Sequence, residues 1–526
     1  MRFLTLAFFS ISTAIAGGLE VSTIFSDHMV LQQAAPIKVW GRADPGAIVE
    51  AEFANQSERA ITDVNGNWTL ELEPVEASFE GRPLSVSCGS SELVFRDVLV
   101  GEVWLASGQS NMEWSVERSI DGDILVLGAN DPYLRLHRVD HATTAKPRFT
   151  GRNHWKLDSA ESAAQFSAVG YQFGRDMRKT LGVPVGIIGA SVGGSPCIAW
   201  MRKEAFSKLP ELMERNDYWE AYWEANLERY DEDYAAWKSE YENWQLKNGI
   251  TEGGYWDHRL LGGPERPEDP QSPKRPARLA NGMITPIAGY ALRGVIWYQG
   301  EQDTGWRPQS YDKRLAVMVE DWRQRWGIDD LPFGIVQLAK LTAPQKRPAN
   351  PSWAKVREGQ RRLAASDPNV GMALALDVGE ANDIHPLDKF TVARRLARWA
   401  LAEIYEELDL AGGPEVKRAV RKNSAILLEF TNTGRGLHAM DSDELGGFSA
   451  SDSLNDAEQG TDFYLVEASI ASETEVILEI PEGRNPLRVR YAWQNNPANA
   501  NLSNKERLPA SPFEIRVSEK LRQISD

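Results

Sequence analysis

The chain has 526 residues, enough for about three or four domains, and its 42% hydrophobic and 25% charged residues are typical of a folded globular protein. With 75 acidic and 58 basic residues the formal charge is −17, which argues against binding to nucleic-acid phosphates or to anionic lipid. No apolar run approaches the roughly 20 residues that span a bilayer.

The N-terminal segment has the pattern of a secretory signal peptide. A basic Met1-Arg2 start is followed by a mostly apolar stretch from Leu4 to Ile15 and by the small-x-small triplet Ala14-Ile15-Ala16. We therefore expect residues 1–16 to be removed, the mature chain to begin near Gly17, and the protein to be secreted or periplasmic. The alternative is a buried N-terminal strand. No cysteine follows the apolar stretch, so no lipid anchor is expected.

The next segment, residues 17–98, is predicted to be a small all-β domain. Short alternating stretches such as Ile37-Lys38-Val39-Trp40 are separated by Gly, Pro and Asn, which is typical of strands joined by turns.

From Leu99 the pattern changes to apolar runs that alternate with helical segments, which predicts an α/β domain over residues 99–410. The expected buried strands are Val103–Ala106, Val185–Gly189, Gly294–Tyr298, Phe333–Leu338 and Met372–Leu376. The expected helices are Gly170–Leu181, Tyr311–Trp326 and Lys389–Leu408. Such an alternation predicts a parallel sheet with helices on both faces. Short apolar runs return after Gly412-Gly413-Pro414 and predict a second β domain over residues 411–526.

An insertion at about residues 205–280 interrupts the α/β domain. Aromatic residues from Trp219 to Trp244 recur at spacings of three and four, which predicts a long amphipathic helix or helix pair whose aromatic stripe packs inward or lines a substrate cleft. Prolines then repeat at every third residue from Pro264 to Pro276, which favours a stiff polyproline II spacer.

Two serines follow predicted strands closely enough to act as a nucleophile, because an α/β sheet presents its reactive groups where strands end. Ser110 lies in Gly108-Gln109-Ser110-Asn111-Met112. Ser191 lies in Gly189-Ala190-Ser191-Val192-Gly193, which fits the Gly-x-Ser-x-Gly nucleophile elbow. The pattern alone leaves both serines open.

Among the seven histidines, His385 is the best candidate for the base. It lies in Asn382-Asp383-Ile384-His385-Pro386, after a predicted strand and before a long helix, and Asp383 can orient its imidazole toward a serine. His137 and His141 have a metal-like spacing of four but no surrounding acidic helix, so they are weak evidence for zinc. Two cysteines, Cys88 and Cys197, are too few for a disulfide scaffold or a cysteine zinc site. They are expected to be unconnected buried thiols, with one bridge between them as the alternative.

Blocks of sequence distributed along the chain resemble the sialate O-acetylesterase family, a branch of the SGNH hydrolases. In chain order they are Phe25–Gln33, Gly101–Met112, Asn281-Gly282-Met283-Ile284, Gly294–Glu301, Asp383-Ile384-His385-Pro386, Tyr491-Ala492-Trp493 and Leu508–Phe513. They span nearly the whole predicted mature chain, which makes the resemblance more specific than any single block.

The resemblance implies a set of roles for the site. Ser110 matches the nucleophile and His385 the general base, while Gly194 matches the glycine of the second block, whose backbone N–H points at the oxyanion. Gln299 stands where simpler SGNH enzymes have asparagine, so its side chain is expected to be the third oxyanion donor beside the N–H groups of Ser110 and Gly194. Glu301 is expected to hold its own turn or to bind a sugar hydroxyl.

The sequence also departs from the wider SGNH pattern. The acid of that clan lies three residues before the histidine, where this chain has Asn382. Asp383 is our choice for the orienting acid, with Asp377 and a serine–histidine pair steered by a backbone carbonyl as alternatives. Val192 stands where relatives commonly have an aromatic residue, which implies a wider cleft.

The implied fold is an SGNH-type, flavodoxin-like parallel sheet with helices on both faces, flanked by small all-β units at both ends. The implied activity is that of a serine esterase that removes O-acetyl groups from carbohydrates, most simply sialic acids, without a metal or organic cofactor and without a protein partner. The alternatives are an acetyl xylan or other plant-polysaccharide esterase that uses the same residues, and a non-catalytic carbohydrate-binding protein.

Overall fold

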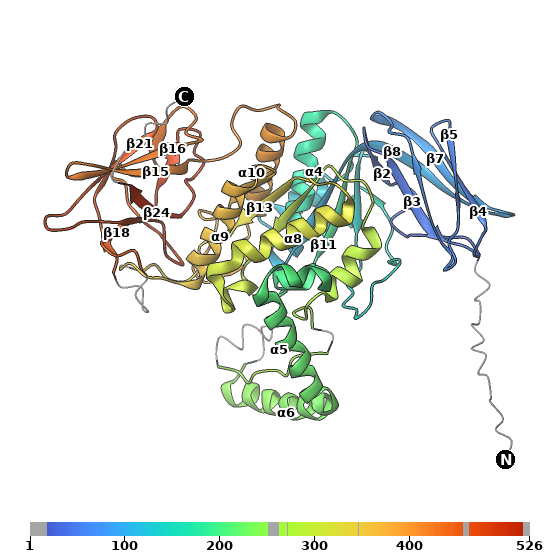
Figure 1. Cartoon of the computed structure of the whole chain (residues 1–526), viewed down its shortest axis with the longest axis horizontal. Coiled ribbons are helices and arrows are strands. Elements are labelled where there is room, and N and C mark those ends of the chain that lie inside the picture. Colours follow the sequence, from blue (N-terminus) through green and yellow to red (C-terminus); the bar gives the residue numbers. More distant parts are fainter. Residues whose placement is uncertain (1–17, 251–261, 271, 346, 456–461, 519–526) are drawn as a thin grey trace, which may run out of the picture.

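The computed structural model describes residues 18–250, 262–270, 272–345, 347–455 and 462–518. The predicted signal peptide and His258 lie outside these ranges. Figure 1 shows an α/β core with one β unit at each end and a helical hairpin that projects from the core. The coarse prediction of an α/β protein with β-rich flanks is therefore confirmed.

A parallel sheet forms the centre of the core. Its strands lie in the order β10 (Lys156–Leu157), β9 (Leu134–Arg138), β11 (Val185–Ser191), β8 (Ser91–Gly108), β12 (Gly294–Tyr298), β13 (Phe333–Gln337) and β14 (Val370–Leu374). All neighbouring pairs from β9 to β14 are parallel, and only β10 is antiparallel. The five strands expected from apolar runs are thus β8, β11, β12, β13 and β14. The last four begin and end within two residues of the prediction, whereas β8 begins twelve residues before the expected Val103.

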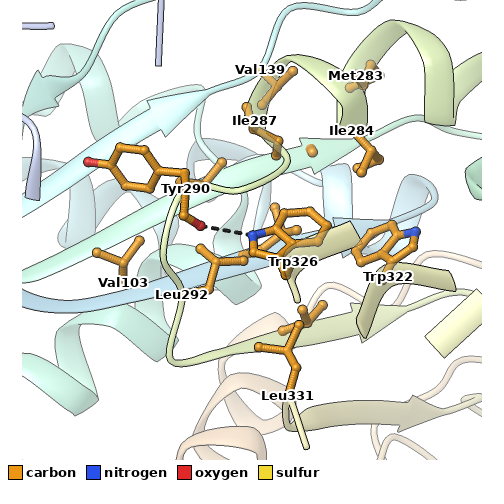
Figure 2. Close-up of a cluster of buried hydrophobic side chains, with 14 of the residues drawn as sticks. Val103, Val139, Met283, Ile284, Ile287, Tyr290, Leu292, Trp322, Trp326 and Leu331 are labelled. Carbon is orange, nitrogen blue, oxygen red and sulfur yellow. Dashed lines mark hydrogen bonds between the residues drawn. The ribbon is translucent and has the colours of Figure 1, made fainter. Parts of the chain in front are cut away.

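Helices cover both faces of this sheet because successive residues of a strand point to opposite sides. Trp104 and Ala106 of β8 pack in one cluster with α4 (Ala168–Leu181) and α10 (Lys389–Glu403). Val103 and Leu105 pack in the other cluster, with α8 (Tyr311–Trp326) and α9 (Ser352–Ser366). Part of that second cluster is drawn in Figure 2, where the Trp326 Nε1–H donates to the Tyr290 carbonyl at 2.9 Å.

The N-terminal unit joins the core through a single long strand. β8 begins among the N-terminal strands, pairing with β7 (Ser78–Cys88) and β2 (Val30–Gln32), and continues past residue 98 into the middle of the parallel sheet. β4 (Ile48–Phe53) and β5 (Gln56–Ile61) extend this sheet, and β1 (Glu20–Val21), β3 (Ile37–Arg42) and β6 (Asn67–Leu72) form a second one.

The C-terminal unit is an eight-stranded sheet with a separate strand pair. The order in the sheet is β19 (Tyr464–Leu465), β18 (Phe448–Ser451), β22 (Arg488–Tyr491), β24 (Phe513–Ser518), β15 (Glu415–Lys422), β16 (Ala425–Thr431), β21 (Glu475–Glu479) and β20 (Ala468–Ile470), and the separate pair is β17 (Leu437–Ala439) with β23 (Leu502–Asn504).

The projecting hairpin consists of α5 (Pro210–Asn226) and α6 (Tyr230–Asn248), which confirms the expected helix pair (Figure 1). Trp219 and Trp223 are buried, and the aromatic rings of α6 contact one another in sequence from Tyr230 to Trp244. The Trp237 Nε1–H donates to the carbonyl of Pro264, so the proline-rich segment packs against α6. The rings of α5 are thus packed inward at Trp219 and Trp223, whereas α6 has no buried residue among those described, so both interpretations of its stripe stay open.

The remaining helical elements are short. They are α1 (Ser110–Glu113), α2 (Gly122–Leu127), α3 (Ala160–Ala164), a π-helical turn at Ala280–Ile284, and 3₁₀ turns at Val116–Arg118, Cys197–Trp200, Lys203–Lys208, Leu227–Arg229, Thr285–Ile287, Gln302–Gly305 and Pro308–Ser310. Within the described ranges, no helix is long and apolar enough to cross a membrane.

Candidate active site

The site lies where the central strand β8 ends. From β8 the chain crosses to β9 and β11 on one side and later to β12 on the other, and the carboxyl ends of strands at such a reversal are where open α/β sheets bind ligands. Gly108 closes β8 with φ of 142°, and a Cβ there would lie 2.1 Å from the Tyr298 carbonyl oxygen. Only glycine fits at this point, and the chain then turns directly into α1, whose first residue is Ser110.

Ser110 and His385, which are 275 positions apart in sequence, meet at this edge of the sheet. Ser110 Oγ and His385 Nε2 are 2.9 Å apart, within hydrogen-bond distance. His385 is on the segment between β14 and α10, and the Leu387 carbonyl of that segment accepts a hydrogen bond from the Ile120 N–H. The structure thus brings together a hydroxyl and an imidazole in the arrangement that activates a serine.

Trp114 fixes the plane of the histidine ring. Its indole stacks on the His385 imidazole, with ring centroids 5.0 Å apart and planes 21° apart, and the Arg118 guanidinium lies 3.8 Å from the indole centroid. Sequence analysis missed Trp114, because a tryptophan four residues after a serine carries no signal until the fold places a histidine beside it.

The two acids considered as partners of His385 have different surroundings. Asp383 Oδ1 accepts the backbone N–H of His385 at 2.7 Å and lies 3.7 Å from the imidazole Nδ1, which is longer than a hydrogen bond. Asp377 makes two hydrogen bonds to the Arg395 guanidinium, at 2.6 and 2.7 Å. Asp383 therefore shapes the histidine turn, and the structure does not bring Asp377 to the imidazole.

The second loop, after β11, lies against the nucleophile. The Gly193 N–H donates to Glu113 Oε2 at 2.7 Å, and a Cβ at Gly193 would be only 3.4 Å from the Cβ of Ser110. Burial alone would raise the pKa of Glu113, but the hydrogen bond and charge of His141 lower it below its ordinary value. The carboxylate thus stays ionised and holds the loop that contains Gly194.

Ser191, the competing nucleophile, is the last residue of β11 and is buried. Over the described ranges no hydrogen bond joins its hydroxyl to a histidine, whereas Ser110 has one. The structure therefore brings Ser110, and not Ser191, to an imidazole.

The Gln299 side chain, after β12, is turned into the protein. It is fully buried, its Nε2 donates to Asp303 Oδ2 at 2.7 Å and to the Ser195 carbonyl at 3.2 Å, and its Oε1 accepts the Tyr311 hydroxyl. Because both N–H groups have protein acceptors, the arrangement does not offer Gln299 as a free donor to the site, contrary to our expectation.

Gln109, next to the nucleophile, has the opposite arrangement. Its Oε1 accepts the backbone N–H groups of Gly300 and Gln302, at 3.4 and 3.2 Å, and these bonds fix which end of the amide is oxygen. Its Nε2 donates to no other residue in the part of the chain that the structure describes. Sequence analysis passed over Gln109 because a side-chain donor was expected after β12.

Glu301 also points inward. Its Oε1 accepts Asn111 Nδ2–H at 2.5 Å, and Asn111 Oδ1 accepts the ammonium of Lys389 at 2.5 Å. Burial raises the pKa of Glu301, and burial lowers the pKa of Lys389 to about 7. Glu301 is thus joined to the nucleophile helix, which is closer to its expected role in the turn than to an exposed sugar contact.

The other polar candidates lie apart from this chemistry. Burial lowers the pKa of His137 to about 3, so it is neutral, and His141 pairs with Glu113 at 3.0 Å. Among the described residues no group of three or more His, Cys, Asp or Glu side chains is arranged to hold a metal ion. Cys88 and Cys197 are both free, and only Cys197 is fully buried.

Comparisons with known proteins point to carbohydrate esterases. Residues 277–401 match the family described as carbohydrate esterase, sialic acid-specific acetylesterase. The sialate O-acetylesterase of Homo sapiens is 26% identical over 432 residues, covering 75% of this chain and 72% of that protein. The sialate O-acetylesterase of Mus musculus is 25% identical over 559 residues, covering 97% and 96%. A crystal structure of a carbohydrate acetylesterase from Xanthomonas citri is 30% identical with a TM-score of 0.76, covering 94% of this chain and 99% of that chain.

Proposed function

The chain belongs to the sialate O-acetylesterase family of carbohydrate acetylesterases, and we propose on this basis that it removes O-acetyl groups from carbohydrates, with O-acetylated sialic acids as the substrate class. The observation that carries the proposal is the 2.9 Å contact between Ser110 Oγ and His385 Nε2 at the end of the central strand. A hydroxyl at this distance from an imidazole nitrogen is within reach of general-base catalysis.

The proposed reaction is a two-step acyl transfer. His385 Nε2 takes the proton of Ser110 as Oγ attacks the acetyl carbonyl, and the protonated imidazole then gives that proton to the departing sugar oxygen. Water next attacks the acetyl-serine, again with His385 as base, and releases acetate. The Trp114 stack and the Asp383 contact to the His385 backbone support this role, because both hold the imidazole in one orientation.

The oxyanion of the tetrahedral intermediate is assigned to the N–H groups of Ser110 and Gly194 and to Gln109 Nε2. None of these three groups donates a hydrogen bond to another residue in the described part of the chain, so all are available. Gln299 is assigned to holding two loops together, since its contacts with Asp303 and Ser195 join the second loop, after β11, to the third loop, after β12.

The proposal includes an SGNH-type fold for the core. Five parallel strands, β8, β11, β12, β13 and β14, lie in the order 2-1-3-4-5 when numbered among themselves, which is the order of flavodoxin-like sheets, and β9 adds a sixth parallel strand at the edge beside β11. Candidate groups follow the first three of these strands and the last, as a site at the carboxyl edge requires. Export as a secreted or periplasmic enzyme is proposed from the pattern of residues 1–16, and the domain limits at residues 98 and 410 remain predictions.

The proposal is tested by the hydrolysis of p-nitrophenyl acetate, O-acetylated sialic acids and acetylated xylan by the wild type and by Ser110→Ala, His385→Ala and Ser191→Ala. We expect the first two variants to lose nearly all turnover while folding normally, and Ser191→Ala to retain it. Turnover lost in Ser191→Ala but kept in Ser110→Ala overturns the assignment. A preference for acetylated xylan over sialic acids overturns the substrate class alone. If the wild type hydrolyses none of these esters, the esterase proposal fails and the carbohydrate-binding alternative takes its place.

A further inference from the structure

Three side chains from three separate segments meet in a buried group next to the proposed nucleophile. Asn111 follows Ser110 on α1, Glu301 follows β12, and Lys389 begins α10. Asn111 and Lys389 have exposed fractions of 1% and 0%, and Glu301 has 7%. The group thus links every segment that contributes to the site except the second loop.

The Asn111 amide can take only one orientation in this group. Glu301 Oε1 accepts a hydrogen bond, so it requires the Nδ2 end, whereas Lys389 Nζ–H donates one, so it requires Oδ1. A flipped amide would set the amide oxygen against the carboxylate oxygen and the amide N–H against Nζ–H. Two partners of opposite character therefore enforce the same orientation.

That orientation leaves one Nδ2 hydrogen, and it is used at the histidine segment. Asn111 Nδ2 donates at 3.0 Å to the Ile384 carbonyl, which immediately precedes His385. Because Asn111 is also adjacent to Ser110, one side chain spans the two residues whose separation decides proton transfer. A shift of the Ile384 carbonyl relative to α1 changes the distance from Ser110 Oγ to His385 Nε2 directly.

Stability alone does not account for the group. Lys389 is buried, and it donates a hydrogen bond to a neutral amide and faces the rings of Trp114 and Tyr298, at 5.4 and 5.9 Å from their centroids. Glu301 Oε2 has no partner among the described residues, so both charged groups lose hydration without full compensation. Apolar residues of similar volume often replace buried charges with no loss of stability.

We propose that Asn111, oriented by Glu301 and Lys389, is a positioning residue that holds the His385 segment at hydrogen-bond distance from Ser110. It touches neither substrate nor reacting atoms, and its role rests on the proposed esterase function. The loss of its hydrogen bond to Ile384 is expected to lower kcat and to leave KM for a small ester nearly unchanged.

The test compares Asn111→Asp with the double variant Asn111→Asp/Glu301→Gln. Asn111→Asp keeps the acceptor for Lys389 and removes both donors, so we expect kcat for p-nitrophenyl acetate to fall about 10- to 100-fold with KM within about threefold, and the melting temperature to fall. The double variant exchanges amide and carboxylate, which restores the bond between positions 111 and 301 but provides no donor for the Ile384 carbonyl. We therefore expect it to recover the melting temperature and not kcat.

Asn504→Asp is the matched control, since Asn504 is a buried asparagine of the C-terminal unit whose Nδ2, like that of Asn111, has two acceptors, here the carbonyls of Gly412 and Asn432. It is expected to lose melting temperature with kcat unchanged. Full kcat in the folded double variant, or in Asn111→Asp, overturns the proposal. If Asn111→Asp does not fold, the double variant alone decides. Ser110→Ala, run beside them, keeps the two proposals apart: turnover in that variant refutes the esterase site, whereas its loss together with full kcat in the position-111 variants refutes only the positioning role.

Discussion

Glu113 offers a quantitative test of how the second loop is held. Its carboxylate accepts the Gly193 N–H at 2.7 Å, and the next residue, Gly194, provides a proposed oxyanion donor. A hydrogen bond to a charged acceptor is worth about 1.5–3 kcal/mol, and about 1.4 kcal/mol corresponds to a factor of ten. If Glu113→Ala releases the loop, kcat for p-nitrophenyl acetate should fall about 10- to 100-fold. The complete removal of an oxyanion donor costs on the order of 10²–10³, so the loss should stay below that range.

The assay is steady-state hydrolysis with thermal melting as a check on folding. Glu117→Ala is the matched control because it removes the same charge four residues later, from an exposed contact with Gln165. Glu113→Gln keeps an oxygen that can accept the Gly193 N–H and is expected to retain more activity than Glu113→Ala. Equal kcat in Glu113→Ala and Glu117→Ala would refute the reasoning. So would a change confined to KM, because the loop is assigned to the transition state.

Three further outcomes follow from single contacts. Trp114→Ala should lower kcat about 2- to 10-fold through loss of the stack on His385, which is worth about 0.5–1.5 kcal/mol, while Trp114→Phe keeps most activity; equal rates in the two variants contradict this. With the pKa of Lys389 lowered to about 7, the unfolded chain holds one more proton than the folded chain between pH 7 and 10. In urea unfolding, the free energy of unfolding of the wild type should therefore rise relative to that of Lys389→Met by up to about 1 kcal/mol per pH unit from pH 7 to 9. A difference between the two free energies that does not change with pH contradicts this. Gln109→Ala should reduce kcat about 100-fold and also lower the melting temperature, because two backbone N–H groups lose their acceptor, whereas Gln299→Ala should lower the melting temperature with a much smaller loss of kcat; the reverse pattern in kcat restores Gln299 as the donor.

The core strands were predictable because a parallel strand is buried on both faces and reads as a continuous apolar run. Val185–Gly189 and Gly294–Tyr298 stand out from the polar segments around them for this reason. The continuity of β8 was not predictable, since the change of pattern near Leu99 marks the point where the strand becomes buried on both faces and not the start of a new element. A boundary placed at residue 98 by composition therefore falls inside a strand.

The sequence indicated the candidate reacting pair, but not the residues that hold the pair in place or the direction of the Gln299 side chain. Ser110 and His385 each follow a strand in a short motif, so the rule that strand ends carry reactive groups makes both of them candidates. The same rule leaves Ser191 equally open, and the choice of Ser110 came from the family resemblance. The direction of Gln299 depends on Asp303 and Tyr311, whose positions are set by the turn that follows it. The sequence pattern of a polar residue at a strand end is the same whether its side chain faces the reacting pair or is turned into the core.

The residues that hold the reacting pair and its loops in place lie on or directly after α1, which explains why one short motif determines several contacts of the site. Successive residues of a helix point about 100° apart, so the single turn of α1 presents its side chains in different directions. Asn111 contacts the third loop and the histidine segment, Glu113 contacts the second loop, and Trp114, just past the turn, contacts the imidazole. A displacement of α1 would move all these contacts at once. The precision of the site is therefore set by the exit from β8, where Gly108 allows the chain to turn without a clash against the neighbouring strand.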